Sequence, residues 1–344
     1  VAVFFSLPAG TVEAQNINLA NQYFQNNEYE KAAALYSQLL ENDDQSELFF
    51  NRYVDCLLNL QQYDECEKVI KKQLKKSPDN VSLYVTYGNL YERQEKIDEA
   101  KAQYERAIEK MAPDYVSVNR LASLFMGSGK YDLATQAYER GSKLLKDTNR
   151  FAFNLGELYR RKGEPAKMIE YYLNALVADP GKIYTIQTLL ARYMGTEDYT
   201  ELQTQLYTRI QAEENPDLVE LLAWSFVQRK DFKSALRQYK ALDKRLDENG
   251  QRVFTLANDA ADAKDYDTAI SGYEYIVAEK GQLNPFFFEA KREAMECRRK
   301  KVTEGFDYTV EELRTLEAEY ESFLTQYERG RNTAHIVIQL ADLE

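Results

Sequence analysis

Apolar positions along the chain follow a pattern that repeats about every 34 residues. In each period a small or apolar residue is followed, four positions later, by a bulky one. The eight pairs are Ala32/Tyr36, Cys66/Ile70, Ala100/Tyr104, Ala134/Tyr138, Met168/Tyr172, Leu202/Leu206, Ala235/Tyr239 and Ala269/Tyr273. Residues three or four positions apart line one face of an α-helix, so each pair predicts an amphipathic helix.

A second pattern lies upstream of each pair and predicts another helix. There a large residue precedes a small one and a bulky residue follows three positions later, as in Leu155-Gly156 with Tyr159. Small residues facing bulky ones allow two helices to interdigitate closely. Polar residues between the two patterns, such as Gly129-Lys130, predict a short turn. Each period therefore predicts a helix–turn–helix hairpin.

Five of the seven prolines fall between the predicted hairpins. They lie at Pro78, Pro113, Pro180, Pro216 and Pro285, with separations of 35, 67, 36 and 69 residues. Because proline cannot continue the hydrogen bonds of a helix, these prolines are predicted to follow the second helix of a hairpin. Pro165 instead lies where a second helix should begin, a position that tolerates proline.

Period, small residues and aromatic positions together resemble the tetratricopeptide repeat (TPR) family, whose hairpins have 34 residues. The resemblance covers residues 15–283 as eight repeats. It implies an all-α fold, an α-solenoid wound as a right-handed superhelix with a concave groove. We expect a divergent ninth hairpin with an insertion at 284–329 and the first helix of a truncated further repeat at 330–344. A half-repeat cannot cap a solenoid, so we expect the chain to be a fragment of a longer protein.

Composition and charge exclude several function classes. Fourteen glycines and seven prolines among 344 residues are too few for a many-stranded sandwich or barrel. The single histidine, His335, leaves no material for a histidine-based metal site or a Ser-His or Cys-His pair. The net charge of −12 opposes nucleic-acid binding, and no apolar run is long enough to span a membrane. We therefore expect no enzyme, no catalytic residue, no cofactor and no metal.

The cysteines and tyrosines have structural explanations beside chemical ones. Cys56, Cys66 and Cys297 are too scattered for a metal site, and Cys66 takes the place of a small packed residue. A Cys56–Cys66 disulfide across one hairpin remains the alternative in an oxidising compartment. Most of the 26 tyrosines fall on repeat positions and are predicted to lie in the core rather than to form a stacking platform.

The first residues resemble the end of a secretory signal peptide. A short apolar run, Val1 to Leu7, precedes Val12-Glu13-Ala14, which has the small-x-Ala form of a cleavage site. We expect residues 1–14 to be a signal peptide remnant and the protein to be exported, to the periplasm of a Gram-negative bacterium. The alternative is a buried N-terminal strand or helix.

The resemblance also implies which residues could bind a partner. In the TPR family the groove is lined by first-helix residues that face away from the partner helix. Basic residues gather around repeats four and five of an otherwise acidic chain. The predicted groove set is Asn89, Asn119, Arg120, Arg150, Phe153, Arg160, Arg161, Trp224 and Phe254. We expect the arginines to accept an acidic or C-terminal carboxylate segment, the alternative being that they are exposed and solubilising.

These observations favour a non-enzymatic scaffold or adaptor that binds a peptide or protein in its groove, in envelope assembly or secretion. The alternative is the N-terminal adaptor region of a longer multidomain protein with a C-terminal enzymatic or peptidoglycan-binding domain. A self-assembling array is a third interpretation, and the oligomeric state stays open.

Overall fold

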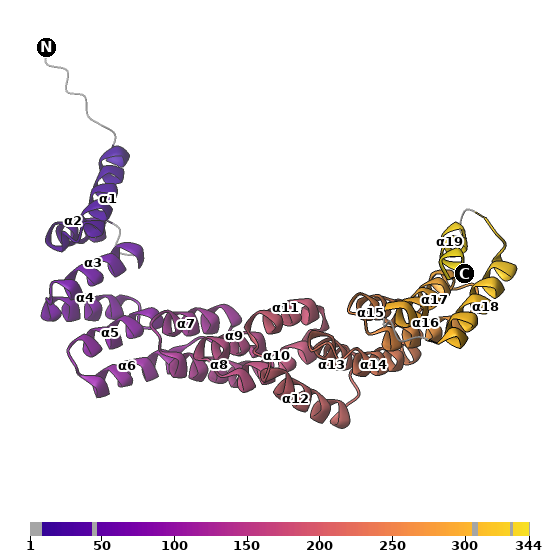
Figure 1. Ribbon diagram of the computed structural model, residues 1–344. Helices are drawn as coiled ribbons and strands as arrows, with labels where there is room; N and C mark the ends of the chain where they lie inside the picture. The colour runs from indigo at the N-terminus through magenta and orange to yellow at the C-terminus, as the bar shows by residue number, and fades with distance from the viewer. Residues whose placement is uncertain (1–8, 43–46, 305–308, 331–332, 344) are drawn as a thin grey trace, which may run out of the picture. The chain divides into compact units, whose positions relative to one another are not determined.

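The computed structural model describes residues 9–42, 47–304, 309–330 and 333–343, and within these ranges all regular structure is helical (Figure 1). The helices are α1 Ala9–Gln25, α2 Tyr29–Asn42, α3 Glu47–Asn59, α4 Tyr63–Lys76, α5 Val81–Arg93, α6 Ile97–Lys110, α7 Tyr115–Gly127, α8 Tyr131–Leu145, α9 Ala152–Lys162, α10 Pro165–Ala178, α11 Ile183–Tyr193, α12 Asp198–Ala212, α13 Pro216–Gln228, α14 Phe232–Arg245, α15 Gln251–Asp262, α16 Tyr266–Lys280, α17 Phe287–Glu304, α18 Val310–Tyr327 and α19 Ala334–Leu343, with a 3₁₀ turn at Pro180–Lys182. The all-α fold of helical hairpins is confirmed.

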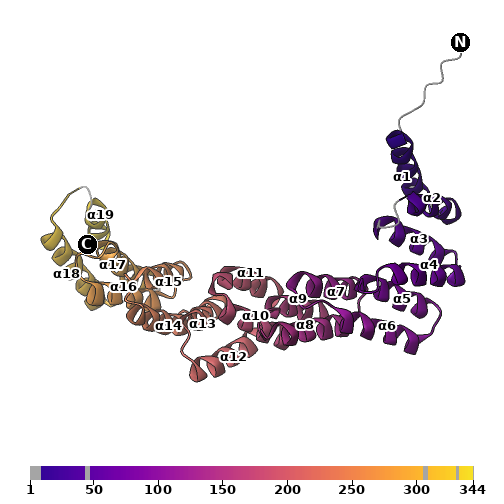
Figure 2. The same cartoon turned by 180° about the vertical axis from the view of Figure 1, so that it is seen from behind.

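The chain forms two compact units, residues 1–151 with α1 to α8 and residues 152–344 with α9 to α19. Within each unit most successive helices pack as hairpins, and the views in Figures 1 and 2 agree on these pairings. This division into two units is not visible in the repeat pattern. At the end of the first unit Phe151 is fully buried, with its ring stacked 5.4 Å from Tyr115.

How closely two helices of a hairpin pack follows the size of one residue on the first helix. Where this residue is glycine or alanine, as at Gly88 and Gly156, the helices contact each other extensively. Where it is Val54 the contact is much smaller. At Leu190, in the sixth hairpin, α12 packs mainly on α10 and α13 instead of on α11. A large side chain at this position holds the second helix away.

Tyrosines of the second helices fill the cores of the hairpins. Tyr36, Tyr138, Tyr172 and Tyr273 are among the largest fully buried side chains. Their hydroxyl groups donate hydrogen bonds back to the first helix, as Tyr104 does to Asn89 over 2.8 Å and Tyr138 to Asn119 over 2.9 Å. The predicted core role of these tyrosines is confirmed, because the rings are buried and the hydroxyls satisfied within the hairpins.

The turn inside a hairpin contains a recurring left-handed residue. Its φ is positive at Asn27, Gln61, Glu95, Gly129, Gly163, Lys230 and Lys264, about one period apart. In the sixth hairpin the corresponding Glu197 has φ −73°, so this turn differs as well. Only two of these positions carry glycine, and the sequence pattern therefore did not reveal them.

Some predicted boundaries move. Pro216 follows α12 as predicted, but it also begins α13, at a position where proline is tolerated. The helix predicted to end at Lys301 continues to Glu304, and 305–308 lie outside the described residues. Residues 1–8 of the predicted signal segment also lie outside them, while Val12 to Ala14 belong to α1. In the described part of the chain no helix has the length and apolarity that a bilayer crossing requires.

Candidate functional site

A hollow of about 790 Å³ opens among the first helices of three successive hairpins in the second unit. Tyr184 of α11 lies at its edge and is 74% exposed. Trp224 of α13, half-buried, lines the hollow, and its ring lies 6.2 Å from that of Tyr199. Tyr239 of α14 adds a third aromatic side chain. Three aromatic residues at the surface of one hollow offer the large contact area that partner-binding sites favour.

A cluster of charged residues lines the same hollow. Arg252 of α15 donates hydrogen bonds to Glu220 of α13 and, over 3.1 Å, to Glu248 of the loop before α15. Burial lowers the pKa of Arg252, but the hydrogen bonds and charges of Glu220 and Glu248 outweigh it and raise the pKa. One guanidinium group is therefore held by two carboxylates.

Two titratable groups of the hollow are shifted towards their neutral forms. Burial, together with the negative charge of Glu220, raises the pKa of Tyr239 to about 12. Burial and the neighbouring Asp262 raise the pKa of Asp259 above its ordinary value. In both cases burial is the larger cause of the raised pKa, and a nearby negative charge adds to it.

The fully buried Asp243 fixes the conformation of the loop that carries Glu248. The carboxylate of Asp243 accepts hydrogen bonds from the Gly250 amide and the Tyr275 hydroxyl, each over 2.7 Å, and pairs with Lys280 over 2.6 Å. Lys280 also donates to the carbonyl oxygen of Glu248 over 2.6 Å. A buried carboxylate with this many donors holds the loop in one conformation.

The predicted arginines of the first unit are in contact with residues of that unit. Arg120 forms an ion pair with Glu47 at the start of α3. The guanidinium group of Arg150 lies 5.4 Å from the ring centre of Tyr115. Both side chains are exposed.

The predicted arginines of the second unit lie at the end of α9. Arg160 binds Glu157 with both its Nε and a terminal nitrogen, at 3.0 to 3.3 Å, and covers the ring of Tyr193 at 4.2 Å. Arg161 is exposed, and its charge helps to lower the pKa of Glu157. Binding of an acidic segment to these arginines stays a prediction.

The remaining predicted groove residues differ in their surroundings. Asn89 and Asn119 accept the tyrosine hydroxyls described above, so their amide oxygens belong to the hairpin cores. Phe153 is half-buried, with its ring 5.7 Å from that of Tyr172. Phe254 does not face the hollow: it is only 9% exposed and stacks 5.0 Å from Phe286. Phe286, just before α17, covers it, a contact that the repeat pattern does not contain.

Four residues that line the hollow were not predicted from the sequence, namely Arg252, Glu248, Tyr239 and Asp259. Arg252 and Glu220 stand 32 residues apart, about one period. Residues one period apart lie side by side on adjacent first helices, so opposite charges at this spacing were the signal that could have found the pair.

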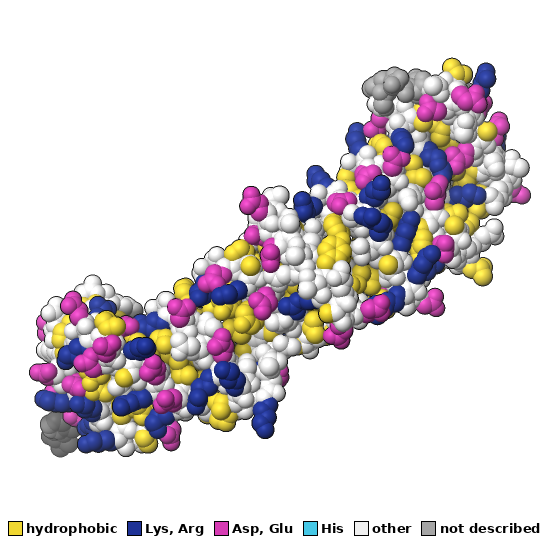
Figure 3. All heavy atoms as spheres, turned by 90° about the horizontal axis from the view of Figure 1, so that it is seen from below, with side chains coloured by type: hydrophobic (Ala, Val, Ile, Leu, Met, Phe, Trp, Pro, Cys, Tyr) yellow, Lys and Arg dark blue, Asp and Glu magenta, His cyan; other side chains and the backbone are white. Residues whose placement is uncertain are grey.

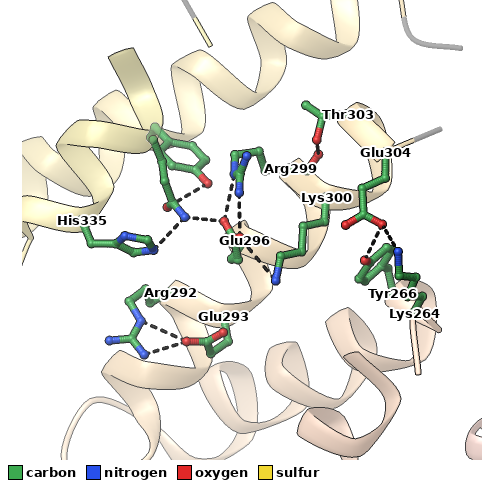
Figure 4. A network of polar contacts seen from close by, with 12 residues as sticks. Lys264, Tyr266, Arg292, Glu293, Glu296, Arg299, Lys300, Thr303, Glu304 and His335 are labelled. Atoms are coloured by element: carbon green, nitrogen blue, oxygen red, sulfur yellow. Dashed lines mark hydrogen bonds and ion pairs between the residues drawn. The ribbon is translucent and has the colours of Figure 1, made fainter. Parts of the chain in front are cut away.

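Among the described residues, His335 lies beside the Gln339 side chain and the cysteines are buried as free thiols. Nε2 of His335 lies 2.8 Å from the side-chain amide nitrogen of Gln339. The same amide group donates a hydrogen bond to the carboxylate of Glu296. Figure 4 shows that Arg299 and Lys300 also pair with this carboxylate. All three cysteines are free and buried, so the Cys56–Cys66 disulfide is not formed in this structure. Among the described residues no group of three His, Cys, Asp or Glu side chains could hold a metal.

Two family models match the chain between residues 14 and 183. A model described as the PRP39 N-terminal HAT repeat matches residues 14–141. A tetratricopeptide repeat model matches residues 119–183.

Curated relatives are repeat proteins as well. A TPR repeat-containing protein of Methanocaldococcus jannaschii is 25% identical over 162 residues, covering 47% of this chain and 28% of that protein. The TPR repeat-containing protein YpiA of Bacillus subtilis is 25% identical over 227 residues, covering 65% of this chain and 45% of YpiA. The chain thus spans less than half the length of these relatives.

Among solved structures, the C-terminal part of a TPR repeat-containing protein of Cytophaga hutchinsonii covers 79% of this chain and 98% of its own, with 18% identity and a TM-score of 0.30. A thermophilic TPR protein of Thermus thermophilus covers 53% of this chain and 98% of its own, with 19% identity and a TM-score of 0.29. The helical hairpins, the family models and the repeat-containing relatives agree in showing that this chain is similar to tetratricopeptide repeat proteins.

Proposed function

We propose that this chain is a non-enzymatic scaffold that binds a peptide or protein partner along the first helices of its hairpins. TPR-type repeats are typically scaffolds of this kind, because stacked hairpins present extended binding surfaces. The observation that carries the proposal is the hollow in the second unit, where three successive hairpins expose aromatic and charged side chains together. Aromatic anchors in a hollow, surrounded by polar groups, are the usual source of binding energy at protein interfaces.

Charged side chains of both signs are mixed on one face of the protein (Figure 3). On the face shown in Figure 3, Lys and Arg side chains alternate with Asp and Glu side chains instead of forming one large field. Mixed charges of this kind keep a repeat protein soluble without steering it to a polyanion.

A further contact with an acidic or C-terminal carboxylate segment is proposed for each unit by itself, at Arg150 in the first unit and at Arg161 in the second. Both side chains are exposed, and guanidinium groups bind carboxylates through two parallel hydrogen bonds. We extend the proposal to an exported protein of envelope assembly or secretion, on the pattern of residues 1–14. Fractionation of cells that express the full reading frame tests export.

Capture experiments on the immobilised chain test the scaffold proposal. Partners eluted from wild type are compared with those from Trp224→Ala and from an Arg150→Glu/Arg161→Glu double variant. We expect saturable binding of at least one protein to wild type, with weaker binding to one of the variants. Binding that is equal on all three chains, or absent from wild type, would contradict the proposal. A sequence that continues into an enzymatic or peptidoglycan-binding domain would instead favour the adaptor alternative.

A further inference from the structure

We propose that the hollow between α13 and α15 receives a cationic side chain, a lysine or arginine of a partner protein. This inference rests on the proposed function and adds the chemistry of the partner. The acidic segment expected at the arginines would bind a different set of residues, so the two expectations do not conflict. Two features of the hollow support the cationic side chain: its excess of negative charge and its aromatic rings.

Negative charge exceeds positive charge in the hollow. Three carboxylates, those of Glu220, Glu248 and Asp259, line it together with one guanidinium group, that of Arg252. Arg252 is already bound by Glu220 and Glu248. The side chain of Asp259 is partly buried but remains accessible to solvent, and the negatively charged Asp262 lies near it. An arriving cation would relieve this repulsion.

The rings favour a cation with an apolar stem. Trp224, Tyr239 and Tyr184 line the same hollow as the carboxylates. The faces of tryptophan and tyrosine rings attract ammonium and guanidinium groups. The methylene stem of a lysine or arginine packs on such rings while its head reaches a carboxylate. Aromatic and acidic groups side by side therefore match both ends of one side chain.

Other occupants fit less well. A carboxylate would meet three like charges, and the positive charge of the one guanidinium group is already offset by Glu220 and Glu248. A wholly apolar segment would remove water from Asp259 and Glu220 without supplying a donor, which costs free energy. Charge complementarity thus selects a basic segment.

Trp224 makes the test direct, because it is the sole tryptophan of the chain and lies in the hollow. End-capped pentalysine and pentaglutamate are titrated into the full chain while tryptophan emission is followed with excitation that spares tyrosine. We expect a saturable change with pentalysine that weakens as salt increases, and none with pentaglutamate. Equal responses to both peptides, or no response to pentalysine, would overturn the inference.

Two variants locate the binding. Asp259→Lys reverses a charge in the hollow and should weaken pentalysine binding about tenfold. Glu213→Lys makes the same change at an exposed position that does not line the hollow and should leave binding unchanged. Circular dichroism melts establish that both variants are folded. Equal affinities of the two variants would overturn the placement in this hollow.

The scaffold proposal and the cation-site proposal can each be contradicted without the other. If the captured partner still binds while pentalysine does not, the scaffold function stands and the cation site falls. If pentalysine binds as expected but no protein is captured, the scaffold function falls and the site remains a cation-binding hollow.

Discussion

The hydroxyl of Tyr172, on the second helix of the fifth hairpin, donates a hydrogen bond to the carboxylate of Glu157 on the first helix. In other hairpins the same tyrosine position meets an asparagine, as Tyr273 meets Asn258 over 2.6 Å. Burial raises the pKa of Glu157, but hydrogen bonds from Arg160 and Tyr172 and the charge of Arg160 outweigh it and hold the pKa below its ordinary value. An ionised group therefore replaces a neutral one at this place in the repeat.

The Glu157 carboxylate should make the second unit sensitive to acid. A carboxylate with a lowered folded pKa stabilises the fold above its unfolded value, near 4.5, and ceases to do so as the pH falls through its folded value. Glu157→Gln does not titrate, and we expect it to lower the free energy of unfolding by about 2 kcal/mol at neutral pH. The difference in melting temperature from wild type should shrink below pH 4.5. A difference in melting temperature that does not change with pH would contradict this account.

Gly156 should not tolerate a side chain. A β-carbon added there would lie 2.6 Å from the ring of Tyr172, well inside normal contact. We expect Gly156→Ala to cost about 1–3 kcal/mol, since an overpacked core must shift. Gly127→Ala is the control, because nothing lies within 4 Å of its β-carbon and alanine favours a helix. Similar melting curves for the two variants would be evidence against close hairpin packing.

Glycine should stabilise a turn that now carries a charged residue. Glu95 has φ 61°, in the left-handed region that disfavours a side chain. We expect Glu95→Gly to raise the melting temperature relative to Lys96→Gly, by the equivalent of about 1 kcal/mol. Lys96 is the neighbouring residue with φ −89°, where glycine adds flexibility and removes the ammonium group that lies 5.9 Å from the ring centre of Tyr91. The reverse order of the two melting temperatures would show that the turn is not left-handed.

The three thiols should be unreactive in the folded protein. Burial raises the pKa of Cys56 and Cys66 to about 12 and that of Cys297 to about 11. Since the thiolate is the reactive form, we expect no reaction with a chromogenic disulfide reagent near pH 8 until denaturant is added. Three thiols should then react, whereas a Cys56–Cys66 disulfide would leave one.

Removing the Asp243 charge should release the loop that carries Glu248. Asp243→Asn leaves the half-buried Lys280 without its counter-ion, which costs about 3 kcal/mol. We expect a lower melting temperature and weaker binding of pentalysine. Tyr275→Phe removes one hydrogen bond and leaves the ion pair, so its effect should be smaller, about 1 kcal/mol. An equal effect of the two changes would show that the ion pair does not fix the loop.

The hairpins could be predicted from the sequence because each places small and bulky residues at fixed spacing. Gly88 and Tyr104, for example, belong to one hairpin and one period. The turn residue at Glu95 escaped prediction because its left-handed conformation follows from the closure of the hairpin and not from the residue type. Propensity alone would place glycine there.

The candidate site was predicted only in part. Trp224 was expected in a groove, and it lines the hollow. Phe254 occupies the same kind of position but is covered by Phe286, from the segment where the repeat pattern loosens. The pairing of Arg252 with Glu220 depends on how adjacent first helices align, which the pattern within one repeat does not contain.

Leu190 has a consequence for how the second unit unfolds. In a stack of repeats cooperativity passes from each hairpin to the next through their shared contacts. At the sixth hairpin α11 and α12 contact each other little, and α12 packs instead on α10 and α13, helices of the two neighbouring hairpins. An unfolding front that starts at either end of α9 to α19 should therefore pause at the sixth hairpin, where the two helices do not support each other.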